Sequence, residues 1–228
     1  MHDLERVAVV GAGRLGTALA AALRAAGMDV DGPLRRGETP PPGTQVVLLC
    51  VPDHAIGDAA AAIEPGPLVG HCSGATTLVP LGGHRAFSLH PLMTVAAHGA
   101  PDFTGVACAV AGHPVAATLA LRLGMRPIRV EDEDRAAYHA AASMASNFLV
   151  TLESAAERLG ATAGLSRADL YPLVRATVEN WYQLGPGALT GPIARGDEAT
   201  VEMHRRALLE RAPDLLGLYD SMAEVTRR

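Results

Sequence analysis

Short apolar runs bounded by glycine and proline dominate the first part of the chain, and segments rich in Ala and Leu separate them. The run at residues 45–51 (QVVLLCV) is apolar throughout, which is typical of a strand buried on both faces of a parallel sheet. The regular alternation of strand and helix predicts a doubly wound parallel sheet of the α/β class. Strands are expected at residues 5–10, 28–34, 45–51, 68–72, 86–90, 106–111 and 128–130, and helices at residues 14–26, 54–63, 76–81 and 113–123.

The pattern changes near residue 131, and from there on only helical spacing recurs. Glycine and proline cluster between the helical segments, most densely at residues 185–196. We therefore expect two domains, an α/β domain at residues 1–130 and an all-α domain at residues 131–228. Helices of the second domain are expected at residues 134–159, 167–183, 198–211 and 213–225.

Composition narrows the classes of partner. The chain has 228 residues, 49% of them hydrophobic, and a formal net charge of −5 with no long basic run. Nucleic acid and anionic membranes attract basic surfaces, so neither is expected as a partner. No apolar run reaches the roughly 18 residues of a membrane span, and the N-terminal residues lack the order of a signal peptide.

The three cysteines, Cys50, Cys72 and Cys108, have no paired spacing. This favours buried thiols in a reducing compartment over a disulfide framework or a zinc site. We therefore expect a cytoplasmic protein without a bound metal.

A glycine turn follows the first expected strand, in the sequence VAVVGAGRLG at residues 7–16. Gly11 allows the tight turn, Gly13 lets the backbone approach a pyrophosphate, and Gly16 lets the helix pack against the strand. Because a strand precedes the turn and a helix follows it, the pattern predicts a nucleotide-binding site for a dinucleotide, with the pyrophosphate on the helix start. The alternative is a turn of structural glycines in another kind of α/β protein. The candidate contacts are Gly11, Ala12, Gly13, Arg14, Leu15 and Gly16.

The end of the second expected strand bears on the choice of dinucleotide. Asp31 lies 20 residues after Gly11, where an acid can bind the ribose hydroxyl of NAD. Arg35 and Arg36 follow the strand, where guanidinium groups can bind the 2′-phosphate of NADP. This placement favours NADP over NAD, although the arginines can also be a solvated loop pair.

Other expected strand ends carry further candidates, since ligands bind at the carboxyl ends of parallel strands. Val51 and Pro52 are expected to border the cofactor. Ser73 is expected to contact the nicotinamide or the substrate, or else to bond only its own turn. His90 ends a strand just before a proline and is a candidate proton donor or substrate anchor, or else a structural histidine.

A polar stripe marks the long helix of the second domain. His139, Ser143 and Asn147 are spaced four apart, so they share one helix face among alanines. Polar groups on such a face need partners, which a substrate pocket or a helix interface of a homodimer supplies. Thr190 and Arg195 lie in a later loop and are candidates for binding a substrate carboxylate; alternatively, the loop is a tight turn with Arg195 paired to Asp197.

Taken together, these motifs resemble Rossmann-like oxidoreductases that carry a C-terminal helical domain of unassigned function. These proteins are distant relatives of pyrroline-5-carboxylate reductase, ketopantoate reductase and 6-phosphogluconate dehydrogenase. The resemblance implies a Rossmann domain, an all-helical second domain, NAD(P)-linked redox chemistry and a homodimer formed through the helical domain. It is carried by Gly11–Gly16, Val51–Asp53, His71–Gly74, Ser88–Leu92, His139–Asn147 and Leu189–Asp197.

One departure from the resemblance concerns the proton donor. In the β-hydroxyacid dehydrogenase relatives, a catalytic lysine precedes an asparagine by four residues. Here Asn147 is present but the lysine position is Ser143, and the whole chain contains no lysine. His139, His90 or a water molecule held by Ser143 would have to supply the proton.

The sequence thus favours an enzyme, an NADP(H)-dependent oxidoreductase that acts on a small carbonyl or imine, for example a 2-oxo acid such as ketopantoate. The competing hypothesis is a non-catalytic module that binds NADP(H) as a sensor or organises a dimer, and the missing lysine supports it. A deazaflavin cofactor is a third hypothesis, which the arginine pair disfavours.

Overall fold

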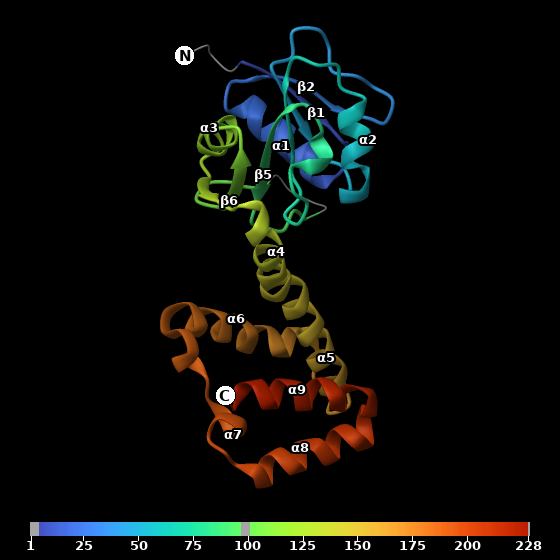
Figure 1. Ribbon diagram of the computed structural model, residues 1–228. Helices are drawn as coiled ribbons and strands as arrows, with labels where there is room; N and C mark the ends of the chain where they lie inside the picture. The colour runs from blue at the N-terminus through green and yellow to red at the C-terminus, as the bar shows by residue number, and fades with distance from the viewer. Residues whose placement is uncertain (1–4, 97–100, 228) are drawn as a thin grey trace. The chain divides into compact units, whose positions relative to one another are not determined.

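The computed structural model describes residues 5–96 and 101–227 (Figure 1). The chain divides into two compact units, Met1–Ser146 and Asn147–Arg228. The change of pattern near residue 131 therefore marks where the long helix begins, whereas the first compact unit ends further along that helix. The reason is that the first turns of this helix belong with the sheet, where the side chain of Arg135 is buried.

The first unit contains one seven-stranded sheet in the order β2-β1-β3-β4-β5-β6-β7. The strands β1 to β5 run parallel, but β6 runs antiparallel to β5. A fully parallel sheet was expected and is wrong at this point: the described residues between β5 and β6 form no crossover helix, and a parallel pairing needs one. The strands are β1 (Arg6–Val10), β2 (Asp29–Leu34), β3 (Val46–Leu49), β4 (Leu68–His71), β5 (Arg85–Pro91), β6 (Ala107–Gly112) and β7 (Arg126–Arg129).

Helices cover both faces of the sheet. Alternate residues of each strand point to opposite faces, so Val7 belongs to the core cluster that includes residues of α1 and α3, while Ala8 belongs to the cluster that includes residues of α2. All four residues of β3 are buried, as its apolar run predicts. The helices of this unit are α1 (Arg14–Ala25), α2 (Ile56–Ala61) and α3 (Val115–Arg122), with short 3₁₀ turns η1 (Asp53–Ala55), η2 (Val79–Leu81) and η3 (Asp132–Asp134).

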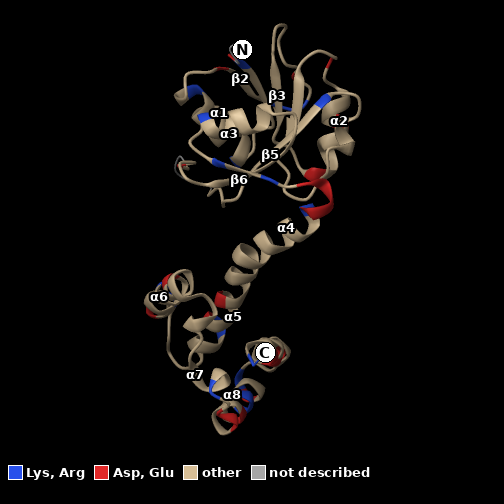
Figure 2. Ribbon diagram, turned by 60° about the vertical axis from the view of Figure 1, so that its left-hand side comes forward, with Lys and Arg blue, Asp and Glu red and all other residues tan. Residues whose placement is uncertain are grey.

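A single long helix follows the sheet and changes its geometry midway. It starts as α4 (Arg135–Ser143), continues as the π-helical segment η4 (Met144–Phe148), and returns to α-helix in α5 (Leu149–Ala161). The boundary between the two compact units falls inside η4. No charged side chain occurs between residues 136 and 152, so this stretch of the helix is uniformly tan in Figure 2.

The second unit is helical but has a very small core. Of its described residues, only Val201, Leu208, Ala212 and Ala223 are buried hydrophobics. No helix of the described chain is both long and apolar enough to cross a membrane. After α5, its elements are α6 (Arg167–Leu184), η5 (Gly185–Ala188), α7 (Gly191–Ala194), α8 (Glu198–Arg211), η6 (Pro213–Leu215) and α9 (Leu216–Thr226).

Candidate functional site

The glycine turn has the geometry of a close backbone contact. Gly11 has a φ of +113°, and a Cβ there would lie 2.2 Å from the Cys50 carbonyl oxygen. A Cβ on Gly16 would lie 1.9 Å from the Gly11 oxygen, so only glycine lets α1 pack this close to β1. At Gly13 no heavy atom lies within 4 Å of the Cβ position, so the backbone of Gly13 borders open space.

The start of α1 is available for an anion. Gly13 is the N-cap residue, no described side chain caps the helix, and its first turn has no acidic residue. Unoccupied N–H groups and the helix dipole favour negative charge at this point. Arg14, the first helical residue, is exposed and adds positive charge beside the turn.

A groove of about 950 Å³ extends from this turn along α1. Small residues of the helix, among them Ala18 and Ala22, form its floor, and Phe103 and Thr104 are on its wall. The groove shares Gly13 and Arg14 with the glycine turn but does not include His90 or His139.

The end of β2 carries both the acidic residue expected to bind the ribose of NAD and the basic residues expected to bind the 2′-phosphate of NADP. Asp31 lies within the strand, and its Oδ2 accepts a hydrogen bond from Arg6 Nε at 3.1 Å. Arg35 and Arg36 follow the last strand residue directly and are exposed. The Glu38 carboxylate accepts from the Arg35 backbone N–H at 2.6 Å and closes the turn. The guanidinium groups are thus available for a phosphate, whereas Asp31 is already paired.

The loop after β4 is held by its own polar groups. The Ser73 hydroxyl accepts from the backbone N–H groups of Ala75 (3.2 Å) and Thr76 (3.0 Å) and contacts the Thr76 hydroxyl at 3.0 Å. Ser73 therefore bonds its own turn, the second of the roles expected for it. Val51 and Pro52, at the end of β3, leave β3 beside this loop because β3 and β4 pair in parallel.

His71, the last residue of β4, is buried beside the same loop. Its Nδ1 accepts from the Ser73 N–H at 3.2 Å, and its Nε2 lies 3.1 Å from the Thr77 carbonyl oxygen. A carbonyl only accepts, so Nε2 carries the proton and the ring is neutral. Burial lowers the pKa of His71, which agrees with this assignment.

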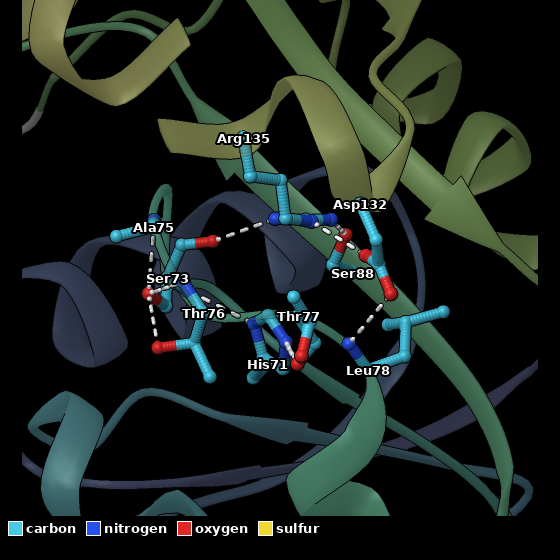
Figure 3. A network of polar contacts seen from close by, with 9 residues as sticks. All are labelled: His71, Ser73, Ala75, Thr76, Thr77, Leu78, Ser88, Asp132 and Arg135. Carbon is cyan, nitrogen blue, oxygen red and sulfur yellow. Dashed lines mark hydrogen bonds and ion pairs between the residues drawn. The ribbon is translucent and has the colours of Figure 1, made fainter. Parts of the chain in front are cut away.

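Arg135 ties three elements together (Figure 3). This side chain is only 1% exposed. It donates to the Ser73 carbonyl oxygen at 3.3 Å, to the Ser88 hydroxyl and to Asp132 Oδ1 at 3.0 Å. The loop after β4, strand β5 and the start of α4 are thereby fixed to one another. Sequence reasoning missed Arg135, because an arginine after four acidic residues at a helix start is typical of a solvated surface.

The same junction brings two predicted histidines together. A Cβ on Gly74 would lie 2.9 Å from both His90 Cε1 and His139 Cδ2, and the centroids of the two imidazole rings are 6.4 Å apart. Burial, reinforced by His139 and Arg135, lowers the pKa of His90 to about 4.

Tyr138, which sequence reasoning did not select, completes this cluster. Its hydroxyl lies 2.7 Å from His90 Nδ1, and the two rings meet edge to face at 5.6 Å. Burial raises the pKa of Tyr138 to about 12. The only signal in the sequence is its position beside His139.

Residues 103–226 match the protein family described as a domain of unknown function, DUF2520. They make up more than half of the chain. The chain belongs to the DUF2520 family. A search of the curated proteins finds no match.

Solved structures similar to this DUF2520 protein share its fold along nearly the whole chain. A protein of Bacteroides fragilis, named provisionally as an NADP oxidoreductase, is 21% identical, with a TM-score of 0.82 and 98% of each chain covered. A protein of Thermotoga maritima is 24% identical, with a TM-score of 0.76 and 97% of this chain and 96% of the other covered. The predicted plan of a Rossmann-like domain followed by a helical region is confirmed.

A reductive aminase of Aspergillus terreus, solved in complex with NADPH and ethyl levulinate, has the same arrangement of elements. It is 17% identical to the DUF2520 chain, with a TM-score of 0.65, and 96% of this chain and 92% of the other are covered.

The remaining candidates of the DUF2520 chain lie on or after the long helix. Ser143 is half-buried in α4, one turn after His139, whereas Asn147 is exposed and belongs to the second unit. Because η4 is a π-helix, the spacing of four from Ser143 to Asn147 is not the α-helical spacing that predicted one stripe. A role for Asn147 beside the histidines stays a prediction.

Thr190 and Arg195 flank the short helix α7 of the second unit. Thr190 is its N-cap residue, Arg195 follows its last turn, and both are exposed. Asp197 accepts from the Thr200 N–H (3.1 Å) and hydroxyl (2.7 Å) and caps α8, as expected. Among the described residues, Arg195 makes no ion pair with Asp197, so binding of a substrate carboxylate by Arg195 stays a prediction.

No group of three or more His, Cys, Asp or Glu side chains in the described chain is arranged to hold a metal ion. Cys50 and Cys72, at the ends of neighbouring strands, have their sulfur atoms 3.6 Å apart. All three cysteines are free thiols.

Proposed function

We propose that this DUF2520 protein is an NADP(H)-dependent oxidoreductase that reduces a small carbonyl or imine compound. The observation that carries the proposal is the placement of two sites on one sheet edge. The open glycine turn follows β1, and the pair of His90 and His139 lies at the ends of β4 and β5. Since β1, β3, β4 and β5 are parallel neighbours, both sites lie at the carboxyl edge where ligands of such sheets bind.

The residues present fit a dinucleotide. Gly13 and the first turn of α1 would hold the pyrophosphate, and Arg35 and Arg36 would bind the 2′-phosphate of NADP. NAD fits less well, because the acid that would bind its ribose, Asp31, is paired with Arg6 inside β2. When bound, NADPH supplies a hydride to the substrate and is oxidised to NADP⁺. The NADPH in the structure of the Aspergillus reductive aminase supports the same preference.

At the carboxyl ends of β4 and β5, the chain offers hydrogen-bonding groups rather than a lysine. His90 and His139 pack against Gly74, and Ser143 follows His139 by one turn. We infer that His90 or His139 provides the proton and that Ser143 and Asn147 hold the reacting oxygen. Hydrogen bonds to the developing negative charge of the substrate oxygen would lower the barrier.

The substrate class is small carbonyl or imine compounds, with 2-oxo acids, ketopantoate among them, as candidates. Arg195 and Thr190 would hold the carboxylate of such an acid. The names of similar structures support reduction of carbonyl or imine compounds, since one is a reductive aminase with a keto ester bound and others are imine reductases.

A panel of 2-oxo acids, simple ketones and cyclic imines, incubated with the protein and NADPH, tests this function. We expect NADPH oxidation with at least one substrate class. His139→Ala and Asn147→Ala are expected to lower turnover while the affinity for NADPH stays near that of the wild type. Tight NADPH binding without turnover of any compound would favour the alternative, a non-catalytic NADP(H)-binding module, for which the absence of lysine is the supporting observation.

We also infer that the protein is a homodimer formed through the helical unit. The helix α6 has no buried residue, and large apolar side chains remain exposed on it, Tyr182 at 74% and Trp181 at 63%. Large apolar side chains exposed together on one helix are typical of a protein–protein interface. A second copy of the chain is the occupant that the family resemblance implies.

A further inference from the structure

The hydrogen bond between Tyr138 and His90 joins two rigidly held elements. The Tyr138 hydroxyl is 2.7 Å from His90 Nδ1, a normal length for a strong bond from a hydroxyl. Tyr138 lies on α4 and His90 on β5. Arg135, one turn before Tyr138, bonds Ser88, two residues before His90. The pair is thus held in register by a second, buried contact between the same two elements.

The other ring nitrogen of His90 is accessible. Nε2 has no hydrogen-bond partner among the described residues, and none of their buried side-chain nitrogen or oxygen atoms lacks a partner. Nε2 therefore keeps some exposed surface. It faces Gly74, where a Cβ would come within 3.0 Å of it. Only a glycine at this place lets the His90 ring pack this close to the end of β4.

The protonation states follow from burial. Burial lowers the pKa of His90 to about 4, so the ring is neutral near pH 7. Burial raises the pKa of Tyr138 to about 12, so the phenol keeps its proton. A phenol that keeps its proton can donate it to Nδ1, and in that tautomer the single proton of the neutral ring is on Nε2. A neutral imidazole is a very weak acid. It gives up the proton on Nε2 readily only when Nδ1 gains a proton at the same time.

We propose that Tyr138 is the proton source of the reduction and that His90 relays the proton to the substrate, an inference that rests on the proposed function. Once the hydride reaches the carbonyl carbon, the His90 Nε2–H bond breaks and an O–H bond forms on the substrate oxygen. In the same step the Tyr138 O–H bond breaks and an Nδ1–H bond forms. His90 stays neutral, and the tyrosinate then takes a proton from water.

This relay selects a class of substrate. The alkoxide formed from a carbonyl is a far stronger base than tyrosinate, so proton transfer from Tyr138 is downhill. A protonated imine already carries its proton and becomes an amine on hydride transfer alone. The relay is therefore built for carbonyl compounds, and its removal should affect carbonyl reduction much more than imine reduction.

The chain contains its own control for this pair. Tyr219 and His204 form a second pair in the helical unit, with the hydroxyl 2.9 Å from Nδ1 and the rings edge to face at 6.0 Å. Tyr219→Phe removes the same kind of hydrogen bond as Tyr138→Phe, but in the other unit.

The test compares Tyr138→Phe, His90→Gln and Tyr219→Phe with the wild type in the full-length protein. NADPH affinity and kcat are measured with a ketone and with a protonated cyclic imine. For Tyr138→Phe we expect kcat with the ketone to fall by roughly 10²–10⁴-fold, the usual contribution of general acid catalysis. Its kcat with the imine should fall by less than about tenfold, its NADPH affinity should be unchanged, and Tyr219→Phe should match the wild type. His90→Gln keeps a donor but cannot relay, so it should resemble Tyr138→Phe.

Two results overturn the relay while the proposed function stands. One is ketone turnover by Tyr138→Phe at the wild-type rate. The other is an equal loss with ketone and imine, which indicates a merely structural role. If the wild type oxidises NADPH with neither substrate, the proposed function itself fails, and the relay with it.

Discussion

Two exposed guanidinium groups after β2 are the reason that we expect NADP rather than NAD as the cofactor. Arg35 and Arg36 have no ion pair among the described residues, whereas Asp31 is bonded to Arg6. A phosphate gains charge-assisted hydrogen bonds from both arginines, and a ribose hydroxyl gains little from an acid that is already paired.

Replacing both arginines should therefore weaken binding of NADPH but not of NADH. Each lost contact with a phosphate is worth about 1.5–3 kcal/mol, so we expect Arg35→Ala/Arg36→Ala to weaken NADPH binding at least tenfold. Isothermal titration calorimetry measures this, with the exposed Arg126→Ala as the control. Equal weakening of NADH and NADPH would show that the arginines do not bind the 2′-phosphate.

Burial of His90 also predicts how stability depends on pH. Its pKa is about 4 in the folded protein and about 6.5 when unfolded. Between these values the unfolded chain binds a proton that the folded protein does not, so stability falls as the pH drops from 6.5 to 4. Thermal unfolding should show a lower midpoint at pH 4.5 than at pH 7, and His90→Gln should reduce this difference. The same pH dependence in His90→Gln as in the wild type would contradict the burial argument.

At the scale of elements, the proposed site depends on Arg135, which fixes the start of α4 to the sheet edge. Its partners Ser73 and Ser88 are buried and belong to different elements. Without the guanidinium, the Ser73 carbonyl and the Ser88 hydroxyl would lose their donor. The histidine cluster depends on this junction, because His139 follows Arg135 by one turn.

Arg135→Met should therefore destabilise the protein. Unpaired buried polar groups cost about 1–3 kcal/mol, and we expect the free energy of unfolding in urea to fall by about that amount. Arg126→Met, an exposed arginine of β7, should change it by less than about 0.5 kcal/mol. An unaltered unfolding midpoint in Arg135→Met would contradict the role given to this network.

Local patterns predicted most elements, because apolar runs and glycine turns act within a few residues. The strands, α1 and the long helix were placed correctly from such signals. The antiparallel direction of β6 was not predicted. It follows from the lack of a crossover helix in the described residues between β5 and β6, and no local sequence pattern marks that lack. Tyr138 and Arg135 were missed for a related reason: their roles arise from contacts with residues some 45–60 positions away in the chain.

At the scale of the whole molecule, the two units differ in how they are stabilised. The sheet unit has two buried apolar clusters, whereas the described part of the helical unit buries few apolar side chains. A unit with so little core needs additional apolar contacts. A second copy of the chain would supply them.

The protein should therefore be a dimer in solution, and charge on α6 should disrupt it. Tyr171, Val178 and Tyr182 are spaced seven and four apart and share one face of the helix. We expect Val178→Glu/Tyr182→Glu to shift the mass measured by light scattering from dimer towards monomer. Gln183→Glu, about 100° away on the helix, is the control. A monomeric wild type would contradict the homodimer.

The most direct test of the account is the fate of the hydride itself. The protein is incubated with NADPH deuterated at the transferable position and with a panel of ketones and 2-oxo acids. The account predicts that the product of at least one of them carries one deuterium on the former carbonyl carbon. NADPH that binds tightly but stays reduced with every compound, with no label in any product, would contradict an oxidoreductase.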